Sequence, residues 1–346
     1  MSGDISQRKL DHIAISLEQD VNMRLNRTGF ERFRFKHQAL PELCPEDINL
    51  ETTFLGHHLA APILISSMTG GPARGETINA NLARAAQKAG TALALGSQRI
   101  IFERPETLSS FQTARANAPD ALIFANVGAV QLNYHLTVTQ CIEAVECVGA
   151  NGLFLHLNPL QEMIQPEGDT DFRGLLAKIK TLTAAVNFPV LVKEVGCGIS
   201  AHTAYQLAQA GVQAVDVSGA GGTSWAKIEA ARAHDPAQRT LGAVFAEWGI
   251  PTVDALIECR AAMPHLPLIA SGGVRTGLEA AKALALGADL VGFAMPFLGP
   301  ATRSSEETEA AVKQVLLELR TTMFLLGIPD IATLRQSRHL LEAIYP

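Results

Sequence analysis

Hydrophobic and polar positions alternate in blocks along most of the chain. From about residue 62, a short run of Val, Ile, Leu and Ala recurs at fairly regular intervals, and each run precedes polar or glycine-rich residues and then an alanine-rich segment. Such runs are typical of buried strands, and the segments between them have helical periodicity. The runs predict strands at 63–66, 92–95, 122–125, 153–157, 190–193, 214–217, 268–270 and 290–293. The intervening segments predict helices at 79–89, 105–116, 137–148, 172–186, 201–209, 252–263 and 277–286.

Strands that are buried on both faces and alternate with helices belong to parallel sheets. Eight of them fit an α/β fold of the closed (β/α)8 TIM-barrel type, which commonly fills about 250 residues as one domain. A doubly wound open sheet is less favoured, because no Gly-x-Gly-x-x-Gly follows the first strand. The longest departure from the repeat, 219–249, predicts an inserted loop with some helix, and 306–326 predicts a last helix before a C-terminal tail.

Residues 1–60 lack a clean period. The stretch 30–37 alternates apolar and charged residues as a half-buried strand would. We interpret 1–60 as an N-terminal extension packed on a barrel formed by 61–346, within a single structural domain.

Composition narrows the class of protein. The 346 residues are 47% hydrophobic and 18% charged, which is the balance of a compact folded protein. A net charge of -6 argues against a general nucleic-acid or anionic-membrane binder, although anionic small molecules can still bind to local clusters. The N-terminus has no apolar core of a secretory signal and no run long enough to span a membrane, so we expect a cytoplasmic protein without a membrane partner. Five cysteines without a Cys-x-x-Cys pair make disulfides and structural zinc unexpected.

Polar side chains follow nearly every predicted strand. In a barrel these positions meet at the carboxyl-terminal rim, where barrel active sites are built. The richest stretch runs from His156 to Asp169 after the fourth strand, and two prolines, Pro159 and Pro166, restrain its backbone. Taken alone this stretch predicts either a solvated loop or a site with an imidazole, amides and a carboxylate.

A phosphate site is predicted after strands seven and eight. Glycine-rich turns there, such as Ser271-Gly272-Gly273, open toward helix N-termini and leave backbone N–H groups free to hold a phosphate. Lys193 ends the apolar run of strand five, and a buried ammonium needs an anionic or electron-rich partner, which a structural pair with Glu194 could also supply. A phosphate cup with such a lysine resembles the FMN site of FMN-binding barrels, where the lysine stabilises negative charge on the reduced isoalloxazine.

Seven motifs occur in order along the predicted rim: Arg8-Lys9-x-x-His12, Ser66 to Gly71, Ser97-Gln98-Arg99, His156-Leu157-Asn158 with Leu160-Gln161-Glu162, Val192 to Gly196, Asp216 to Trp225, and Ala270 to Gly273. Together they resemble the motifs of type 2 isopentenyl-diphosphate isomerases. The resemblance implies an enzyme that interconverts isopentenyl and dimethylallyl diphosphate. It also implies that FMN must be reduced, with NADPH as the usual reductant, and that Mg²⁺ is required.

The same resemblance implies roles for individual residues. Reduced flavin N5 is the favoured proton donor and acceptor in this family, so Gln161 is assigned to positioning the substrate and to relaying a proton, since an amide alone has no useful pKa near neutrality. Glu162 becomes a Mg²⁺ ligand through the diphosphate, and His156 and Asn158 donate to the diphosphate or orient Gln161. Implied substrate contacts are Arg8, Lys9, His12, Ser97, Gln98, Arg99 and Gln161. Implied FMN contacts are Ser67, Met68, Thr69, Ser97, Asn126, Lys193, Ser218, Thr223, Gly272, Gly273, Val274, Ala294 and Met295.

Two consequences concern the whole protein. Arg8 and Lys9 can reach the site if the N-terminal segment closes over it as a lid that excludes water. The family also tends to form homo-oligomers, tetramers or octamers.

Other functions stay open. The main rival is an FMN barrel oxidoreductase of the 2-hydroxy-acid oxidase or dihydroorotate dehydrogenase kind. A hydroxy-acid oxidase would need a His base and an Arg partner after strand six, where this chain has Ser218-Gly219-Ala220-Gly221-Gly222. An inosinate-type dehydrogenase would need a nucleophilic Cys in that loop, and we interpret Cys197, after strand five, as a small filler. A flavin-binding barrel without enzymatic activity is the third reading.

Overall fold

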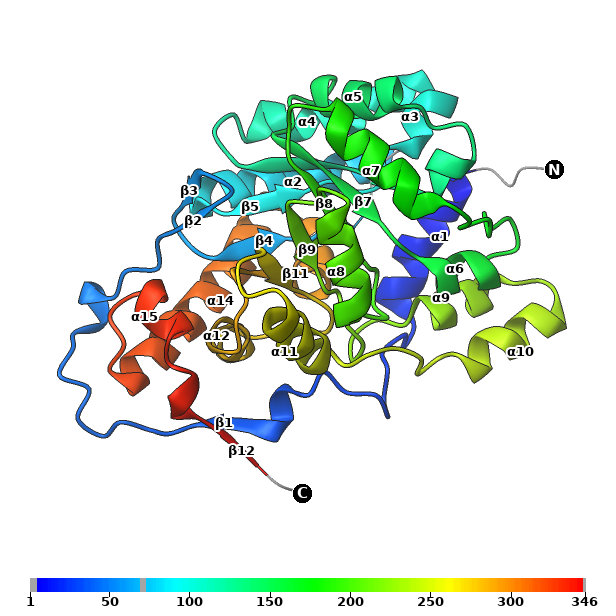
Figure 1. The fold of residues 1–346 in the computed structure, drawn as a ribbon. Helices are drawn as coiled ribbons and strands as arrows, with labels where there is room; N and C mark the ends of the chain where they lie inside the picture. The colour runs from blue at the N-terminus through cyan, green and yellow to red at the C-terminus, as the bar shows by residue number, and fades with distance from the viewer. Residues whose placement is uncertain (1–4, 69–72, 345–346) are drawn as a thin grey trace.

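The computed structural model describes residues 5–68 and 73–344. Within these residues eight parallel strands close into a barrel in the order β10-β11-β4-β5-β6-β7-β8-β9, and helices surround it (Figure 1). The barrel strands are β4 (Ile63–Ile65), β5 (Ala92–Ala94), β6 (Ile123–Gly128), β7 (Gly152–His156), β8 (Val190–Lys193), β9 (Ala214–Asp216), β10 (Leu268–Ala270) and β11 (Leu290–Phe293). The predicted TIM barrel is confirmed.

The helices agree with the predicted repeat, with several additions. Seven cover predicted segments: α2 (Ala73–Ala89), α4 (Ser109–Asn117), α5 (Val138–Glu146), α7 (Leu175–Ala185), α8 (Ala201–Gln209), α11 (Thr252–Ala262) and α12 (Gly277–Ala285). The inserted region contains α9 (Trp225–Arg232) and α10 (Pro236–Val244), and the last long helix is α14 (Ser305–Leu326). Elements that the sequence pattern did not reveal are α1 (Ile5–Glu18), α3 (Arg99–Glu103), α6 (Pro159–Ile164), α13 (Met295–Ala301) and α15 (Ile331–Arg335). Short 3₁₀ helices lie at Phe30–Arg32, Pro45–Asp47, Pro105–Leu108, Ala129–Asn133 and Arg338–Leu340.

Two expectations need correction. The stretch after the fourth strand is not wholly a loop, because Pro159 begins the short helix α6 with its fixed φ. The N-terminal extension has periodic structure after all, because its opening forms α1, which lies beside α9 (Figure 1). The local signal for α1 is weak because this helix packs on the barrel rim, where its inner face carries polar residues that line a cavity.

Inward-facing side chains change from apolar to polar along the barrel axis. A lower group fills the interior, with at least one residue from each strand or the loop beside it: Leu64, Ala92, Ala94, Leu122, Phe124, Phe154, Leu191, Ala214, Ile269 and Leu290. Two residues farther along each strand, side chains point inward again. There the positions are Ser66, Gly96, Asn126, His156, Lys193, Asp216, Ser271 and Gly292. The sequence thus builds an apolar plug below and a polar floor above.

The N-terminal extension closes the barrel from below and joins the chain ends. The hairpin of β2 (Thr52–Phe54) and β3 (His57–Leu59) places Phe54 and Leu59 against the apolar interior cluster. The predicted half-buried strand is shorter than expected, because Phe30–Arg32 forms a 3₁₀ turn before β1 (Phe33–Phe35). β1 pairs antiparallel with β12 (Leu341–Ala343), so the first and last segments hold each other.

Two arginines form matching clamps on opposite sides of the barrel. Arg115, at the end of α4, donates to the carbonyls of residues three, four and six positions later, to Gly149 O and to Asn151 Oδ1. Arg260, at the end of α11, makes the same set, with Gly287 O and Asp289 Oδ2 in the equivalent places. The strands that follow, β6 and β10, are four apart in the barrel order. The two halves of the barrel therefore repeat one helix-to-strand connection.

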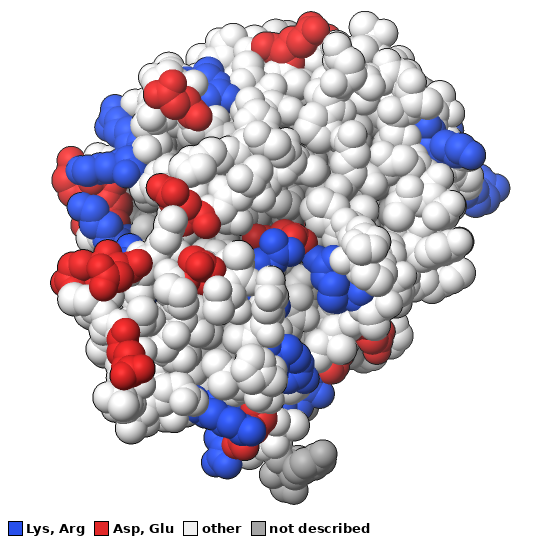
Figure 2. All heavy atoms as spheres, turned by 60° about the vertical axis from the view of Figure 1, so that its left-hand side comes forward, with Lys and Arg blue, Asp and Glu red and all other residues white. Residues whose placement is uncertain are grey.

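Charge is spread in small groups over the surface. On the face shown in Figure 2, basic and acidic side chains alternate over a mostly neutral surface. Within the described ranges, every helix is too short or too polar to cross a bilayer.

Candidate active site

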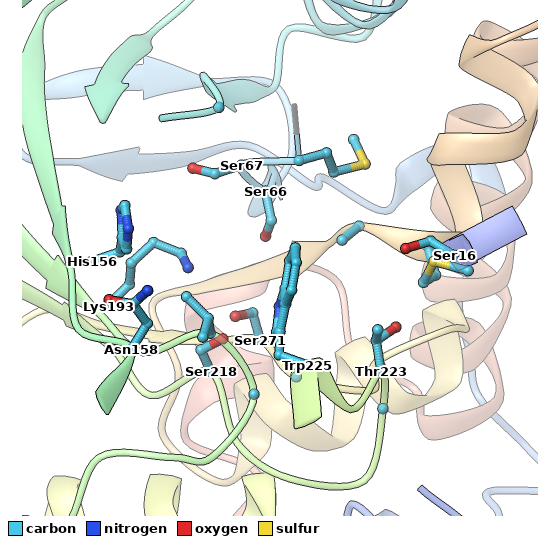
Figure 3. Close-up of a pocket in the computed structure, with 18 of the residues that line it drawn as sticks. Ser16, Ser66, Ser67, His156, Asn158, Lys193, Ser218, Thr223, Trp225 and Ser271 are labelled. Atoms are coloured by element: carbon cyan, nitrogen blue, oxygen red, sulfur yellow. The ribbon is translucent and has the colours of Figure 1, made fainter. Parts of the chain in front are cut away.

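A cavity opens above the polar floor of the barrel. Its walls come from the ends of the strands, the loops that follow them and the inner face of α1. In Figure 3, His156, Asn158 and Lys193 lie on one side, Ser66 and Ser67 on another, and Trp225 stands between them and Ser16. The cavity therefore gathers the strand ends that the sequence placed on one rim.

Glycines after β10 let the backbone approach this cavity. Gly272 has φ +97° and Gly273 has φ +74°, a region that favours glycine. A Cβ on Gly272 would collide with the backbone of Gly219, and one on Gly273 would collide with Thr28 and Gly221. The two loops pack backbone against backbone, and Gly272, Gly273 and Val274 line the cavity. The cradle is therefore built from main chain, as a phosphate site requires.

Lys193 forms part of the floor. It ends β8, is 6% exposed, and donates from Nζ to the carbonyl of Glu194 at 2.6 Å. The Glu194 carboxylate faces away and accepts the N–H groups of Val195 and Gly196 at 2.6 and 2.8 Å, together with that of Cys197. The alternative of a side-chain pair with Glu194 is wrong, because neighbours on a strand point to opposite faces. Burial lowers the pKa of Lys193.

His156 presents an acceptor to the cavity. Asn126 donates its Nδ2 to Leu95 O at 3.1 Å, so its Oδ1 faces His156 Nδ1 at 3.0 Å and accepts that N–H. Burial, reinforced by the charges of Lys193 and Lys9, lowers the pKa of His156 to about 3. The imidazole is therefore neutral with its Nε2 lone pair free. Donation from His156 to a diphosphate stays a prediction, and in this tautomer it requires protonation of Nε2.

Gln161 is held in one orientation by two neighbours. Its Oε1 accepts from Asn158 Nδ2 at 3.0 Å, and its Nε2 donates to Glu229 Oε1 at 2.9 Å. Because a carboxylate only accepts, Glu229 fixes which end of the amide is the NH₂ group. Asn158 therefore orients Gln161, while Asn158 Oδ1 is buried without a partner among the described residues.

Glu229 is the functional residue that the sequence reasoning missed. It is 0% exposed on α9, and its oxygens lie 3.0 Å from His12 Nε2 and 2.6 Å from Arg232 Nη1. Burial alone would raise its pKa, but the contacts with His12, Gln161 and Arg232 outweigh burial and hold the pKa at about 2. The sequence feature that could have revealed it is its position one helical turn after Trp225. The Trp225 ring packs edge-on against His12, with centroids 5.1 Å apart. Glu229 thus joins α1, α6 and α9.

The cations of α1 face the cavity as predicted. Lys9 donates to Ser97 O at 2.8 Å, and its Nζ lies 5.3 Å from the ring centroid of Phe111. Burial and the charge of Arg8 lower the pKa of Lys9 to about 7. Arg8 has an acidic neighbour, Glu167, at 3.8 Å. Because the charges of these two cations are incompletely paired, they can bind an anion in the cavity.

Most predicted contact residues line this cavity. They are Arg8, Lys9, His12, Ser67, Met68, Ser97, Asn126, His156, Asn158, Gln161, Lys193, Ser218, Thr223, Gly272, Gly273, Val274, Ala294 and Met295. Thr69 lies outside the described residues.

Three predicted residues have other partners. Gln98 is 0% exposed and holds Ala144 O and Asn126 N, so it supports Asn126 and its assignment to the substrate is corrected. Arg99 pairs with Asp169 at 2.6 Å and Glu103 at 3.0 Å. Glu162 accepts from Asn158 and from the N–H of Asp169, beside the cavity and not in its lining.

The residues present fit a bound FMN. The Ser66 and Ser67 hydroxyls are buried beside the cavity without partners among the described residues, so a ligand in the cavity would complete their hydrogen bonding. The glycine cradle offers backbone donors for a phosphate, and the Lys193 ammonium and the His156 acceptor lie on the same floor. A phosphorylated, hydrogen-bonding ring system satisfies all three groups.

Comparisons with known proteins give first the class and then the particular group. Residues 1–116 and 129–341 match the FMN-dependent dehydrogenase family model. A flavocytochrome b2 variant with sulfite bound superposes with a TM-score of 0.71 at 20% identity, covering 96% of this chain and 82% of that one. A lactate oxidase from Pediococcus acidilactici also gives 0.71, at 19% identity, covering 99% and 94%. At this identity the two structures establish the fold alone.

The chain belongs to the FMN-dependent dehydrogenase family, and within it to the isopentenyl-diphosphate delta-isomerases of type 2. It is 50% identical to the isopentenyl-diphosphate delta-isomerase of Nostoc sp. over 339 residues, which is 98% of this chain and 97% of the relative. It is 52% identical to that of Synechococcus sp. over 332 residues, or 96% and 95%. The resemblance of the seven motifs is confirmed.

Proposed function

We propose that this protein interconverts isopentenyl diphosphate and dimethylallyl diphosphate in isoprenoid biosynthesis. The observation that carries the proposal is the fixed orientation of Gln161, which hydrogen-bonds to both Asn158 and Glu229 at the wall of the cavity. The same cavity is lined by Arg8 and Lys9, whose charges are incompletely paired. An allylic proton shift needs a substrate held rigidly beside the cofactor, with no net oxidation. This geometry suits positioning better than hydride abstraction from a hydroxy acid.

The anionic end of the substrate is expected on the α1 side. Arg8 and Lys9 would supply charge-assisted contacts, and Ser97 lies beside Lys9 in the lining. Closing α1 over the rim would keep water away from the reacting carbons. The acidic whole molecule thus binds a diphosphate through a local cluster and not through its net charge.

Gln161 has a positioning role in this proposal. Its amide cannot titrate near neutrality, and its Nε2 is engaged by a carboxylate whose pKa is about 2. The Glu229 carboxylate therefore stays charged and keeps the amide in place throughout the reaction. The neutral His156 would accept a hydrogen bond from an uncharged N–H group of the bound ligand.

FMN is the cofactor that the family membership gives, and in its reduced form it would supply the acid and base for the allylic shift. Ser67, Met68, Asn126, Lys193, Ser218, Thr223 and the Gly272-Gly273 cradle would hold it. NADPH is proposed as the reductant. It is supported by the resemblance and by the need for reduction before turnover.

Mg²⁺ is proposed as a bridge to the diphosphate. No cluster of three His, Cys, Asp or Glu residues that could hold a metal occurs in the described part of the chain. Glu162 beside the partnerless Asn158 Oδ1 gives two protein oxygens, which fits a cation that takes its remaining ligands from phosphate and water.

The decisive assay uses isopentenyl diphosphate with FMN, NADPH and Mg²⁺, with the product identified by NMR. We expect dimethylallyl diphosphate with only catalytic NADPH consumed. Oxidation of a 2-hydroxy acid or dihydroorotate in a parallel assay, without isomer formation, would instead support the oxidoreductase alternative. Omitting Mg²⁺ alone tests the metal, and replacing NADPH by dithionite tests the reductant.

Self-association as a tetramer or octamer completes the proposal. Met163, Val244 and Trp248 are 61%, 71% and 60% exposed near α6 and α10, which supports a covered apolar surface. Light scattering of the holoprotein measures the state directly.

A further inference from the structure

Asp216 lies directly below the cavity and takes no part in its lining. It ends β9, is 0% exposed, and is paired in register with Lys193 on β8. Because registered neighbours in a parallel sheet point to the same face, both side chains turn into the barrel. The same row continues to His156 on β7. An acidic, a basic and a neutral polar side chain thus share one level of the interior.

The hydrogen bonds of Asp216 are incomplete. Oδ1 accepts Ser271 Oγ at 2.7 Å and Ser218 N at 3.1 Å, whereas Oδ2 is buried without a partner in the described residues. Ser271 and Ser218 themselves line the cavity. A carboxylate in this place is costly unless a positive charge compensates it.

Lys193 has the complementary need. Among the residues that the structure describes, its ammonium donates one hydrogen bond, to a neutral carbonyl. Burial lowers its pKa, and the largest opposing influence is the negative charge of Asp216, followed by that of Glu194. Burial likewise raises the pKa of Asp216, and Lys193 is the largest influence that opposes it. Each residue therefore keeps the other charged.

We propose that Asp216 is a positioning residue for the flavin: it is the buried countercharge that keeps Lys193 an ammonium at the cavity floor. Ser271 and Ser218 tie this carboxylate to the loops that wall the same cavity. The ammonium is what stabilises negative charge on a reduced flavin, so Asp216 tunes the cofactor through Lys193 without touching it. The inference rests on the FMN site of the proposed function and not on the identity of the substrate.

Other ionisable groups face Lys193 from the neighbouring elements. His156 on β7 is neutral, because its pKa is about 3. Glu194 comes directly after β8, and its carboxylate accepts hydrogen bonds from three backbone N–H groups. Burial raises its pKa to about 7. Arg8 and Lys9 on α1 line the same cavity, and their charges act on His156. Asp216 therefore remains the main influence that favours the charged lysine.

The first test measures Lys193 directly in the apoprotein. Lysine labelled with ¹³C at Cε is followed by NMR through a pH titration, with the signal assigned by Lys193→Met. In Asp216→Asn we expect the pKa of Lys193 to fall by more than about one unit. An unchanged titration would overturn the proposal. This readout needs neither flavin nor substrate, so it fails independently of the proposed function.

The second test uses the holoprotein and depends on a sign. If Asp216→Asn neutralises Lys193, the reduction potential of bound FMN becomes more negative, and the N1 pKa of bound reduced FMN rises. If Lys193 stayed charged, removing a negative charge would shift the potential the opposite way and refute the inference. Lys193→Met should shift the potential in the same direction, and adding Asp216→Asn to it should change little further. Near-ultraviolet circular dichroism of each variant confirms the fold.

Discussion

At the scale of single residues, the site depends on how each side chain is held. Gln161 and the neutral His156 each have one hydrogen-bond donor group and one acceptor atom, and their neighbours decide which of the two faces the cavity. Glu229 holds the NH₂ group of Gln161 toward α9, and Asn126 Oδ1 accepts the hydrogen bond of the His156 Nδ1–H. The chemistry of the site thus lies in pairs of residues.

Replacing Glu229 by Gln tests whether this carboxylate holds the site together. The variant keeps the size of the side chain but removes the charge that holds His12 and Arg232 and fixes Gln161. We expect kcat/KM for isopentenyl diphosphate to fall by about a hundredfold, with FMN affinity retained. Glu247→Gln is the matched control, because that carboxylate holds the backbone of residues 24–26 outside the cavity lining. Equal losses in both variants would contradict a specific role for Glu229.

Lys9 should make substrate binding depend on pH. Its pKa is about 7 because of burial and the nearby Arg8, so the side chain is an ammonium below that pH and neutral above it. An anionic diphosphate prefers the ammonium, hence its Kd should rise as the pH increases above about 7, by at most about tenfold per unit. Calorimetry with wild type and Lys9→Arg checks this. The arginine variant should give a flat profile, and a flat wild-type profile would remove the role.

At the scale of elements, α1 connects the extension to the chemistry. Five of its residues line the cavity, and Arg8, Lys9 and His12 are the titratable ones among them. The chain after α1 is fastened separately, through Met23 N to Gly222 O and Ser224 N to Val21 O, both at 2.8 Å. Residues 21–23 are therefore held to the rim by backbone hydrogen bonds that do not involve the helix.

Deleting residues 1–18 should separate substrate binding from cofactor binding. The deletion removes the cations for the diphosphate but leaves the strand ends and the glycine cradle that would hold FMN. We expect KM to increase by more than about tenfold, while the Kd for FMN changes by less than about threefold. Fluorescence titration of FMN and steady-state kinetics give both values. A normal KM would show that α1 is not the lid.

At the scale of the whole molecule, two equivalent connections brace opposite sides of the barrel. Arg115 and Arg260 each satisfy several carbonyls between a helix and the next strand. The strand after the Arg115 clamp, β6, carries Asn126, and the strand after the Arg260 clamp, β10, leads into the cradle of Gly272 and Gly273. Asn126 and the phosphate cradle thus follow equivalent connections in the two halves.

Arg115→Met and Arg260→Met should destabilise the protein to a similar extent. Each leaves several partly buried carbonyls without their charged donor, which corresponds to about 2–4 kcal/mol of unfolding free energy. The control is Arg34→Met, because Arg34 forms an exposed pair with Glu342, and such pairs contribute little to stability. Urea unfolding of the apoproteins measures all three. A loss limited to one of the two clamps would argue against their equivalence.

The sequence by itself determined the barrel, because strands buried on both faces must be apolar throughout and the helices between them repeat with a regular pattern. It also determined which residues meet at the rim, since parallel strands all end on the same side: Asn126, His156, Lys193 and Gly272 were placed correctly. Only the tertiary structure decided how they are used. Glu229 lies at the site because α9 packs against α6. Gln98 does not, because its amide is hydrogen-bonded to the backbone of Ala144 and Asn126. Such contacts join residues distant in sequence, and short-range patterns carry no record of them.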